Sequence, residues 1–566
     1  MYTTPLPIDA VLPELGGALA RGMRAVLQAP PGAGKTTRVP LELLGAPWLA
    51  GQRIVMLEPR RLAARAAARR MASTLGESAG ATVGYRVRGD SRVSARTRVE
   101  VVTEGVLTRL IQDDPSLEGI GLVIFDEFHE RNLVADLGLA LTLQSAELLR
   151  PELRILVMSA TLDGAGVSRL LGGAPIVSSE GRAFPVETRW VPRRAGVWIE
   201  PAVAGVVERA LAAHEGDVLV FLPGAAEIRR TAQALNERAL PANTTVFALH
   251  GTLPLEEQDR AIAPSAPGMR KVVLATAVAE TSLTIEGVRV VVDSGLARVP
   301  RFSPRSGMQR LETVRVSKDA AEQRRGRAGR VAPGVCYRLW DEGEHAQLLE
   351  RRPPEMLEAD LAPLALELAA AGIDDPLTLA WLDPPPAGAY QQACELLRVL
   401  GALDARGRIT PHGRQMTGVG IHPRLAHLVL RGVARGCGAL ACDLAALLAE
   451  RDPLRTDASN GDPDLRTRLE LLRTSGAERD GRVDRGRLFQ IRDEARRLRG
   501  EVGARRDDDG TDADALAGEL VALAYPDRVA LSRGEHGRFV MRNGRGARVD
   551  GASALATAAC LAIADT

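Results

Sequence analysis

The 566-residue sequence predicts an α/β protein with two strand–helix series in tandem, followed by a helical region and a short β-region. Short β-branched runs alternate with Ala-, Leu- and Arg-rich stretches over residues 1–190 and again over 200–350, which favours parallel sheets covered by helices. Beyond residue 350 the helical pattern dominates. With 45% hydrophobic and 25% charged residues, the composition is typical of a soluble globular protein of several domains.

Ten short apolar runs are expected to form the buried strands of the two series. The first series contains Ala25–Leu27, Arg53–Leu57, Val99–Val102, Leu122–Phe125 and Ile155–Met158. The second contains Val218–Leu222, Val246–Leu249, Val272–Ala275, Val288–Val292 and Val335–Leu339. The segment Trp190–Trp198 includes Pro192 and two arginines, and we expect it to link the two series.

The C-terminal third changes from helix to strand along its length. Leu361–Ala371 and Tyr390–Leu400 are strongly helical, and residues 426–520 are almost entirely helix-like, with an arginine-dense stretch at Arg482–Arg506. Asp507–Gly510 is expected to be a loop. From Tyr525 onward, the run Arg538–Met541 and the glycine-rich turn Asn543–Gly546 indicate β-structure.

The basic residues consist almost entirely of arginine. The 73 basic residues comprise 70 arginines and three lysines, against 71 acidic residues, so the net charge of +2 gives no indication of a polyanionic partner. Where arginine replaces lysine so widely, a retained lysine marks a position that needs a compact ammonium. The three candidates are Lys35, Lys271 and Lys318.

The cysteines and the hydropathy of the sequence indicate the cellular compartment in which the protein is expected. The five cysteines form no CxxC pair, so neither a zinc site nor a disulfide scaffold is indicated, and a reducing cytoplasm fits. The N-terminus lacks a basic segment followed by an apolar one, so no signal peptide is expected. No apolar run approaches the roughly 18–20 residues of a membrane span, so we expect no membrane partner.

A phosphate-binding loop is predicted where the first strand ends. Residues Ala29–Thr36 read APPGAGKT and precede a helix, although Ala29 stands where the usual pattern begins with glycine. Gly32 and Gly34 allow backbone amides to point at phosphates, and Lys35 can reach the β/γ oxygens. Thr36 can supply a hydroxyl to Mg²⁺. A chance Gly/Pro turn is the alternative.

An acidic pair follows another buried strand. Asp126 and Glu127 stand at the carboxyl end of Leu122–Phe125, where a parallel sheet places its ligands. Asp126 can hold a metal, and Glu127 can orient and deprotonate an attacking water. The alternative is a helix N-cap with an acidic first turn, which becomes improbable beside a phosphate-binding loop.

Four arginines lie within eight residues near the end of the second series. Gln323–Arg330 reads QRRGRAGR. This segment can be a solvated helix face, or it can present arginines to a nucleotide bound on the other lobe and stabilise charge on the transferring phosphoryl group.

Taken together, these segments resemble superfamily 2 helicases of the DEAH/RHA group, in particular the bacterial HrpB-type helicases. Further segments resemble the remaining motifs in order: Leu57–Ala64 (Ia), Thr103–Leu107 (Ib), Asp126–His129 (II), Ser159–Thr161 (III), Phe221–Gly224 (IV), Ala275–Ile285 (V) and Gln323–Arg330 (VI). The set covers about residues 30–330. Phe128 stands where the group's name has alanine.

The resemblance implies a role for each matching position. ATP would be bound by Gly32, Gly34, Lys35, Thr36, Thr37 and Asp126, with Thr36 and Asp126 serving Mg²⁺. Glu127 and Gln323 would act on the attacking water, and Arg327 and Arg330 would be arginine fingers. Nucleic acid would be contacted by Arg60, Thr103 and Thr276, and hydrolysis would be coupled to lobe movement by Ser159 and Thr161. Ile262 falls where related enzymes place an aromatic residue against adenine.

The resemblance also implies a domain order. It predicts RecA-like lobe 1 at 1–190, RecA-like lobe 2 at 191–352, a winged helix at 353–425, a helical ratchet-like domain at 426–520 and a partial OB-like segment at 521–566. Family members continue through the OB-fold, whereas this chain ends inside that segment. For residues beyond 353, a helical stability domain is the alternative.

The implied activity is that of an ATP-dependent RNA helicase moving 3′-to-5′ on single-stranded RNA. A helicase acting on DNA is the first alternative, because backbone contacts discriminate poorly unless a 2′-OH is read. An NTP-binding scaffold without motor activity is the second. We expect a cytoplasmic monomer, and the sequence indicates no particular protein partner.

Overall fold

The computed structural model describes residues 5–30, 32–160, 164–180, 184–194, 196–251, 253–280, 285–303, 308–454, 462–505, 513–542, 544–550 and 553–564. The chain forms two compact units. The first comprises Met1–Arg301, Arg310–Ala359 and Leu377–Pro384, and the second Phe302–Gln309, Asp360–Pro376 and Pro385–Thr566. The first unit holds two mainly parallel sheets, one for each predicted strand–helix series.

An eight-stranded sheet forms the first lobe, in the order β4-β3-β5-β2-β6-β7-β1-β8. Its strands are β1 (Arg24–Gln28), β2 (Arg53–Leu57), β3 (Val83–Val87), β4 (Asp90–Arg92), β5 (Val99–Val102), β6 (Ile120–Phe125), β7 (Arg154–Ser159) and β8 (Ile176–Ser178). All neighbours pair in parallel except β3 and β4. The carboxyl ends of β1 and β6 therefore reach the same edge, which brings the phosphate-binding loop to the acidic pair.

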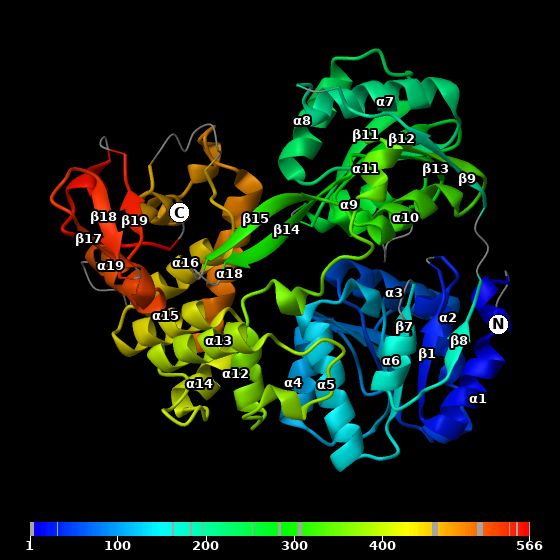
Figure 1. Cartoon of the computed structure of the whole chain (residues 1–566), viewed down its shortest axis with the longest axis horizontal. Helices are drawn as coiled ribbons and strands as arrows, with labels where there is room; N and C mark the ends of the chain where they lie inside the picture. Colours follow the sequence, from blue (N-terminus) through cyan, green and yellow to red (C-terminus); the bar gives the residue numbers. More distant parts are fainter. Residues whose placement is uncertain are drawn as a thin grey trace. The chain divides into compact units, whose positions relative to one another are not determined.

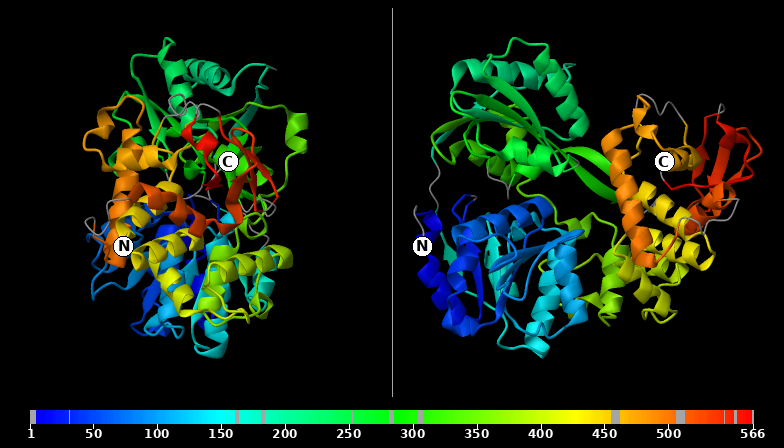
Figure 2. Two further views of the ribbon diagram at one scale, coloured as in Figure 1. Left: turned by 90° about the vertical axis from the view of Figure 1, so that its left-hand side faces the viewer. Right: turned by 180° about the vertical axis from the view of Figure 1, so that it is seen from behind.

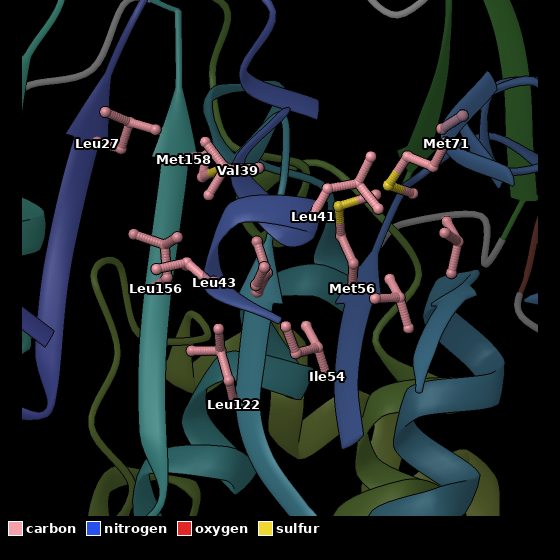
Figure 3. Close-up of a cluster of buried hydrophobic side chains, with 14 of the residues drawn as sticks. Leu27, Val39, Leu41, Leu43, Ile54, Met56, Met71, Leu122, Leu156 and Met158 are labelled. Atoms are coloured by element: carbon pink, nitrogen blue, oxygen red, sulfur yellow. The ribbon is translucent and has the colours of Figure 1, made fainter. Parts of the chain in front are cut away.

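Helices cover both faces of this sheet (Figure 1). They are α1 (Leu12–Gly22), α2 (Lys35–Leu43), α3 (Arg61–Thr74), α4 (Glu104–Asp113), α5 (Leu133–Leu148) and α6 (Gly164–Leu170). On one face, alternate residues of the central strands pack against α2 and α3, as Figure 3 shows for Leu27, Ile54, Leu156, Val39 and Met71. This aliphatic core fits a chain with only 3% aromatic residues.

A six-stranded sheet forms the second lobe, in the order β11-β12-β10-β13-β16-β9. Its strands are β9 (Val186–Trp190), β10 (Asp217–Phe221), β11 (Thr244–Leu249), β12 (Arg270–Ala275), β13 (Val288–Asp293) and β16 (Gly334–Arg338), and all pairs are parallel. Its helices include α7 (Ile199–Ala213), α8 (Ala225–Asn236), α9 (Leu255–Ile262), α10 (Lys318–Gly326) and α11 (Glu342–Ala346). The strands β14 (Leu296–Ser303) and β15 (Met308–Arg315) form a separate two-stranded sheet.

Helices make up most of the second unit. They are α12 (Ala362–Ala370), α13 (Ala387–Val399), α14 (Pro411–Val419), α15 (Pro423–Ala434), α16 (Gly438–Ala449), α17 (Leu465–Arg473), α18 (Arg485–Val502) and α19 (Ala513–Ala524). A four-stranded antiparallel sheet follows, drawn in red in Figure 2. It comprises β17 (Val529–Ser532), β18 (Arg538–Met541), β19 (Gly546–Arg548) and β20 (Cys560–Ala562), in the order β19-β18-β17-β20. None of the described helices combines the length and hydropathy that a bilayer span requires.

All ten strands predicted from the sequence are confirmed, with small differences at their ends. The sequence interpretation missed β3, β4, β8, β9 and the pair β14–β15. The strand β9 lies before the predicted lobe boundary at residue 190, yet it pairs with β16 as the edge strand of the second sheet. Its sequence is VETRW, with three consecutive polar residues between Val186 and Trp190, so the run lacks the continuous apolar character of a central parallel strand. The loop expected at Asp507–Gly510 lies outside the described residues, as does Asn543.

Candidate nucleotide-binding site

The phosphate-binding loop joins β1 to α2, and its glycines adopt conformations that other residues rarely take. Gly32 and Gly34 have φ of +86° and +99°. A Cβ at Gly34 would also lie 2.6 Å from Leu6 Cδ1, so the position excludes a side chain on two grounds. Because α2 begins at Lys35, the amides of its first turn are available to an anion.

Lys35 is buried against the acidic pair. Its ammonium donates to Glu127 Oε1 over 2.6 Å and lies 3.5 Å from Asp126 Oδ1. Burial acts to lower the pKa of Lys35, but the two carboxylates outweigh it and raise that pKa above its ordinary value. Lys35 therefore stays a cation and stands where phosphate oxygens would compete with the carboxylates for it.

The oxygen atoms of Thr36 and Asp126 meet at the end of β6. The Thr36 hydroxyl donates to Asp126 Oδ2 over 2.5 Å, and Asp126 Oδ1 accepts the backbone N–H of Glu127 at 2.8 Å. A hydroxyl and a carboxylate on one side of a phosphate-binding loop form the hard oxygen set that Mg²⁺ prefers. Thr36 and Asp126 therefore suit the predicted Mg²⁺ site, because their side-chain oxygens lie next to each other.

Glu127 lies immediately beyond β6 in a left-handed conformation, with φ of +49°. Its Oε2 is buried without a hydrogen-bond partner, and His129 Nδ1 lies 3.4 Å away. Burial favours a raised pKa, but the charges of Lys35 and His129 outweigh it and lower the pKa of Glu127 to about 2. The side chain is thus a buried carboxylate with one oxygen open to a further donor, such as a water.

Motif III lies against the same loop. The carbonyl of Ser159, the last residue of β7, accepts the Ala29 N–H at 3.0 Å. The next amide, from Ala160, donates to His129 Nδ1 at 3.4 Å. Ser159 is fully buried, so the strand end is joined to both the phosphate-binding loop and motif II. Thr161, the second predicted coupling residue, lies outside the described residues.

The arginines of motif VI do not form a solvated helix face. Gln323, Arg324 and Arg327 are all buried, and the Arg327 Nε donates to the carbonyl of Glu280 at 2.9 Å. Burial, reinforced by the charge of Arg330, lowers the pKa of Arg327. Burial also lowers the pKa of Arg330, to about 10. These cations are held in a low-dielectric setting, where an anionic ligand gains most from them.

Arg330 reaches the phosphate-binding loop of the first lobe. A methyl group added at Gly32 would lie 3.8 Å from Arg330 Cδ and Nε. Two sequence motifs almost 300 residues apart are therefore adjacent. One predicted arginine finger thus lies beside the phosphate-binding loop that is predicted to hold ATP. Ile262, at the end of α9, is half-buried and packs against the core of its own lobe.

The three residues predicted to contact nucleic acid lie at the ends of strands or helices in the first unit. Arg60 forms an ion pair with Glu130 (3.0 Å) and donates to the carbonyl of Ala277 (2.8 Å) in the second lobe. Thr103 immediately precedes α4, and Thr276 immediately follows β12; both are half-buried. Their contact with nucleic acid stays a prediction.

The sequence interpretation missed several residues of this neighbourhood. Glu58 is fully buried at the end of β2 with no hydrogen-bond partner for either oxygen, and burial raises its pKa well above the ordinary value. Glu280 receives both Arg324 and Arg327. Glu130 and Arg131 directly follow motif II, and that adjacency was the available signal for them.

Fold and site together define the class. Two parallel sheets in tandem, with a phosphate-binding loop and acidic pair on the first and buried arginines on the second, form a RecA-like helicase core. The family model for the DEAD/DEAH box helicase matches residues 12–170, and that for the helicase conserved C-terminal domain matches residues 203–332. The chain belongs to the DEAH/RHA helicases.

Two relatives support this assignment, and one of them, HrpB, matches both in structure and in sequence. The crystal structure of Escherichia coli DEAH/RHA helicase HrpB aligns with a TM-score of 0.85 and 43% identity, covering 98% of this chain and 67% of that one. The ATP-dependent RNA helicase HrpB of E. coli strain K12 is 44% identical over 97% of this chain and 65% of its own length. The pre-mRNA-splicing factor ATP-dependent RNA helicase prp22 of Schizosaccharomyces pombe is 34% identical over 83% of this chain and 42% of its own length. The chain thus spans about two thirds of HrpB and less than half of prp22.

Proposed function

We propose that this chain is an ATP-dependent RNA helicase that couples ATP hydrolysis to 3′-to-5′ translocation on single-stranded RNA. One observation carries the ATPase part: Arg330 of the second lobe lies beside Gly32 in the phosphate-binding loop of the first. A nucleotide there would contact both lobes, so its hydrolysis would change how they hold each other. The RNA preference is supported by the relatives' names, and the polarity by the family resemblance.

Lys35 is the residue whose contacts change most when phosphate arrives. The ammonium that now holds Glu127 would turn to the β/γ oxygens, since those carry more charge than one carboxylate. Glu127 would then lose the partner that contributes to its low pKa, and would become a better base towards a water held near Gln323. Substrate binding thereby prepares the base.

Thr36 and Asp126 are proposed to hold Mg²⁺, which when bound would neutralise charge on the β- and γ-phosphates. Gly32, Gly34 and Thr37 would present backbone and hydroxyl donors to the phosphates. Arg327, which is buried, and Arg330, which is half-buried, would stabilise the charge that develops on the γ-phosphoryl group. Each of these roles belongs to a residue within the first unit.

Arg60, Thr103 and Thr276 are proposed to hold the strand by its backbone, which suits translocation over any sequence. Ser159 and Thr161 would relay hydrolysis to lobe movement; the link from Ser159 to Ala29 supports this for Ser159. We assign residues 353–425 to a winged helix, 426–520 to a helical ratchet-like domain and 521–566 to a partial OB-like segment. The antiparallel order β19-β18-β17-β20 supports the last.

We propose that the protein works as a monomer in the cytoplasm. All five cysteines are free thiols, three of them buried, which supports a reducing compartment.

The test is ATP turnover by the purified chain with and without single-stranded RNA. We expect RNA to stimulate turnover, and Glu127→Gln to lower kcat by about 10²–10⁴-fold while nucleotide binding persists. Unchanged turnover in Glu127→Gln would refute the assignment of the base.

Matched duplexes separate the proposal from its alternatives. An RNA duplex and a DNA duplex of one sequence, each with a 3′ or a 5′ overhang, should be unwound in the order RNA over DNA and 3′ over 5′. Preferential unwinding of DNA would favour a DNA-directed helicase, and ATP binding without turnover would favour a scaffold.

A further inference from the structure

The turn that follows Glu127 is strained at both ends. Phe128–Glu130 forms a single 3-10 turn, flanked by Glu127 at φ +49° and Arg131 at φ +47°. Neither is a glycine, and side-chain-bearing residues rarely occupy this left-handed region. Two such residues within five positions persist only when the surroundings hold them there, so the contacts of Arg131 bear directly on the placement of Glu127.

The Arg131 guanidinium contacts three segments of the chain. Its Nε and Nη2 donate to the two carboxylate oxygens of Asp136 in α5, at 3.2 and 3.0 Å. The same Nη2 lies 2.8 Å from Asp383 Oδ2. The guanidinium carbon also lies 5.9 Å from the centre of the Phe128 ring. Because the planar fork of arginine fixes direction as well as distance, these partners define the orientation of the side chain.

The main chain of the same turn is held by Glu355. Its N–H donates to the carbonyl of Arg131 at 3.0 Å, and its Oε2 accepts the N–H of Leu133, the first residue of α5, at 2.9 Å. Glu355 and Asp383 both lie beyond the second lobe in the sequence. Residues 377–384 belong to the first unit, although the stretches on either side of them belong to the second.

We propose that Arg131 is a positioning residue for ATP hydrolysis, clamped by Asp383 and Glu355 so that the turn carrying Glu127 keeps its left-handed geometry. The inference rests on the proposed function of Glu127 as base. Residues 377–384 then act on the ATP site from outside both lobes, through one ion pair.

If the Arg131–Asp383 ion pair served only to stabilise the fold, removing it would lower the stability of the protein. Asp136 is buried and would by itself suffice to hold Arg131 against α5. The Asp383 side chain is 41% exposed, and ion pairs of that exposure contribute little to stability. Removing the Asp383 charge should therefore leave the protein folded while releasing one side of the clamp, which makes this residue the informative one to change.

The experiment compares Asp383→Asn with Asp374→Asn in the full chain. Asp374 is an exposed aspartate nine residues upstream, so it matches the charge change without touching Arg131. For Asp383→Asn we expect kcat for ATP to fall roughly tenfold, because small displacements of a catalytic group are costly, with KM for ATP within about twofold. Asp383→Glu, which keeps the carboxylate, should recover most of the loss.

A second measurement does not depend on turnover. Amide hydrogen exchange over residues 127–133 should accelerate in Asp383→Asn and stay at the parental rate in Asp374→Asn, with both variants keeping the parental unfolding midpoint. Unchanged exchange and kcat in Asp383→Asn, or equal losses in both variants, would overturn the inference. A parent chain that hydrolyses no ATP would refute the proposed function, while the exchange comparison would still decide whether the clamp holds the turn.

Discussion

Lys271, in β12, is buried against the C-terminal end of α9, and its contacts explain why lysine is retained there. Its ammonium donates to three consecutive carbonyls, of Ala261 (3.2 Å), Ile262 (3.4 Å) and Ala263 (2.5 Å). Such carbonyls lack partners within a helix and carry the negative end of its dipole. An ammonium offers three donors around one point, whereas a guanidinium offers a flat fork, so arginine does not suit this cluster.

Replacing Lys271 with arginine should therefore destabilise the second lobe, although the substitution keeps the positive charge. We expect Lys271→Arg to lose about 1–3 kcal/mol in the free energy of unfolding, since buried carbonyls lose their donors. The measurement is urea unfolding followed by tryptophan fluorescence, to which Trp190 and Trp340 of that lobe contribute. Lys318→Arg is the matched control, because Lys318 pairs with the exposed Glu350 and should change stability little. Equal losses in both would contradict this explanation.

At the scale of the element, α10 is fixed to its lobe by a charged side chain in the core. Arg324 is 1% exposed and donates to Glu280 Oε1 and Asp293 Oδ1, both over 2.7 Å. It thereby ties motif VI to motif V and to the end of β13. The net pKa of Arg324 is raised, because the two carboxylates outweigh its burial.

Breaking this network should cost much more than breaking a surface pair. We expect Arg324→Met to lose about 3 kcal/mol or more, because Glu280 and Asp293 would remain buried without their cation. Arg315→Met removes an exposed pair with Glu344 and should lose less than about 1 kcal/mol. Urea unfolding of both variants beside the parent would check the difference. A loss for Arg324→Met as small as for Arg315→Met would show that the network does not hold α10.

At the scale of the whole first unit, the candidate site depends on both lobes. Lys35, Asp126 and Glu127 belong to the first lobe, and Arg327 and Arg330 follow α10 of the second. In the proposed roles, the first lobe supplies Glu127 and Lys35 and the second supplies the two arginines, so hydrolysis would need both lobes.

Arg330→Ala should separate nucleotide binding from hydrolysis. We expect kcat for ATP to fall about 10³-fold, the usual cost of removing an arginine finger, with nucleotide affinity changed much less. Arg325→Ala is the control within the same motif, because Arg325 donates to Thr188 and to the carbonyl of Val186 in β9 instead. Steady-state kinetics and binding of a fluorescent nucleotide would report the two quantities. A similar kcat for Arg330→Ala and the parent would exclude Arg330 as a finger.

The sequence by itself determined the parallel strand series and the chemistry-bearing motifs. A central parallel strand is buried on both faces, so Ile120–Phe125 appears as a continuous apolar run, and the residues after it fall at the ligand-binding edge. The edge strand β9 was not predicted, because it has a neighbouring strand on one side only and its sequence mixes polar and apolar residues. For the lysines, only the loop position of Lys35 had a local signal.

Only the tertiary structure decided which charges meet. Motif VI was compatible with a solvated face or a buried cluster, because eight residues of local sequence do not contain their partners Glu280, Asp293 and Gly32. The Arg131 contacts with Glu355 and Asp383 span more than 220 residues of chain and likewise leave no local pattern. Local sequence encodes strands through burial and loops through backbone geometry, whereas long-range ion pairs exist only once folding brings distant segments together.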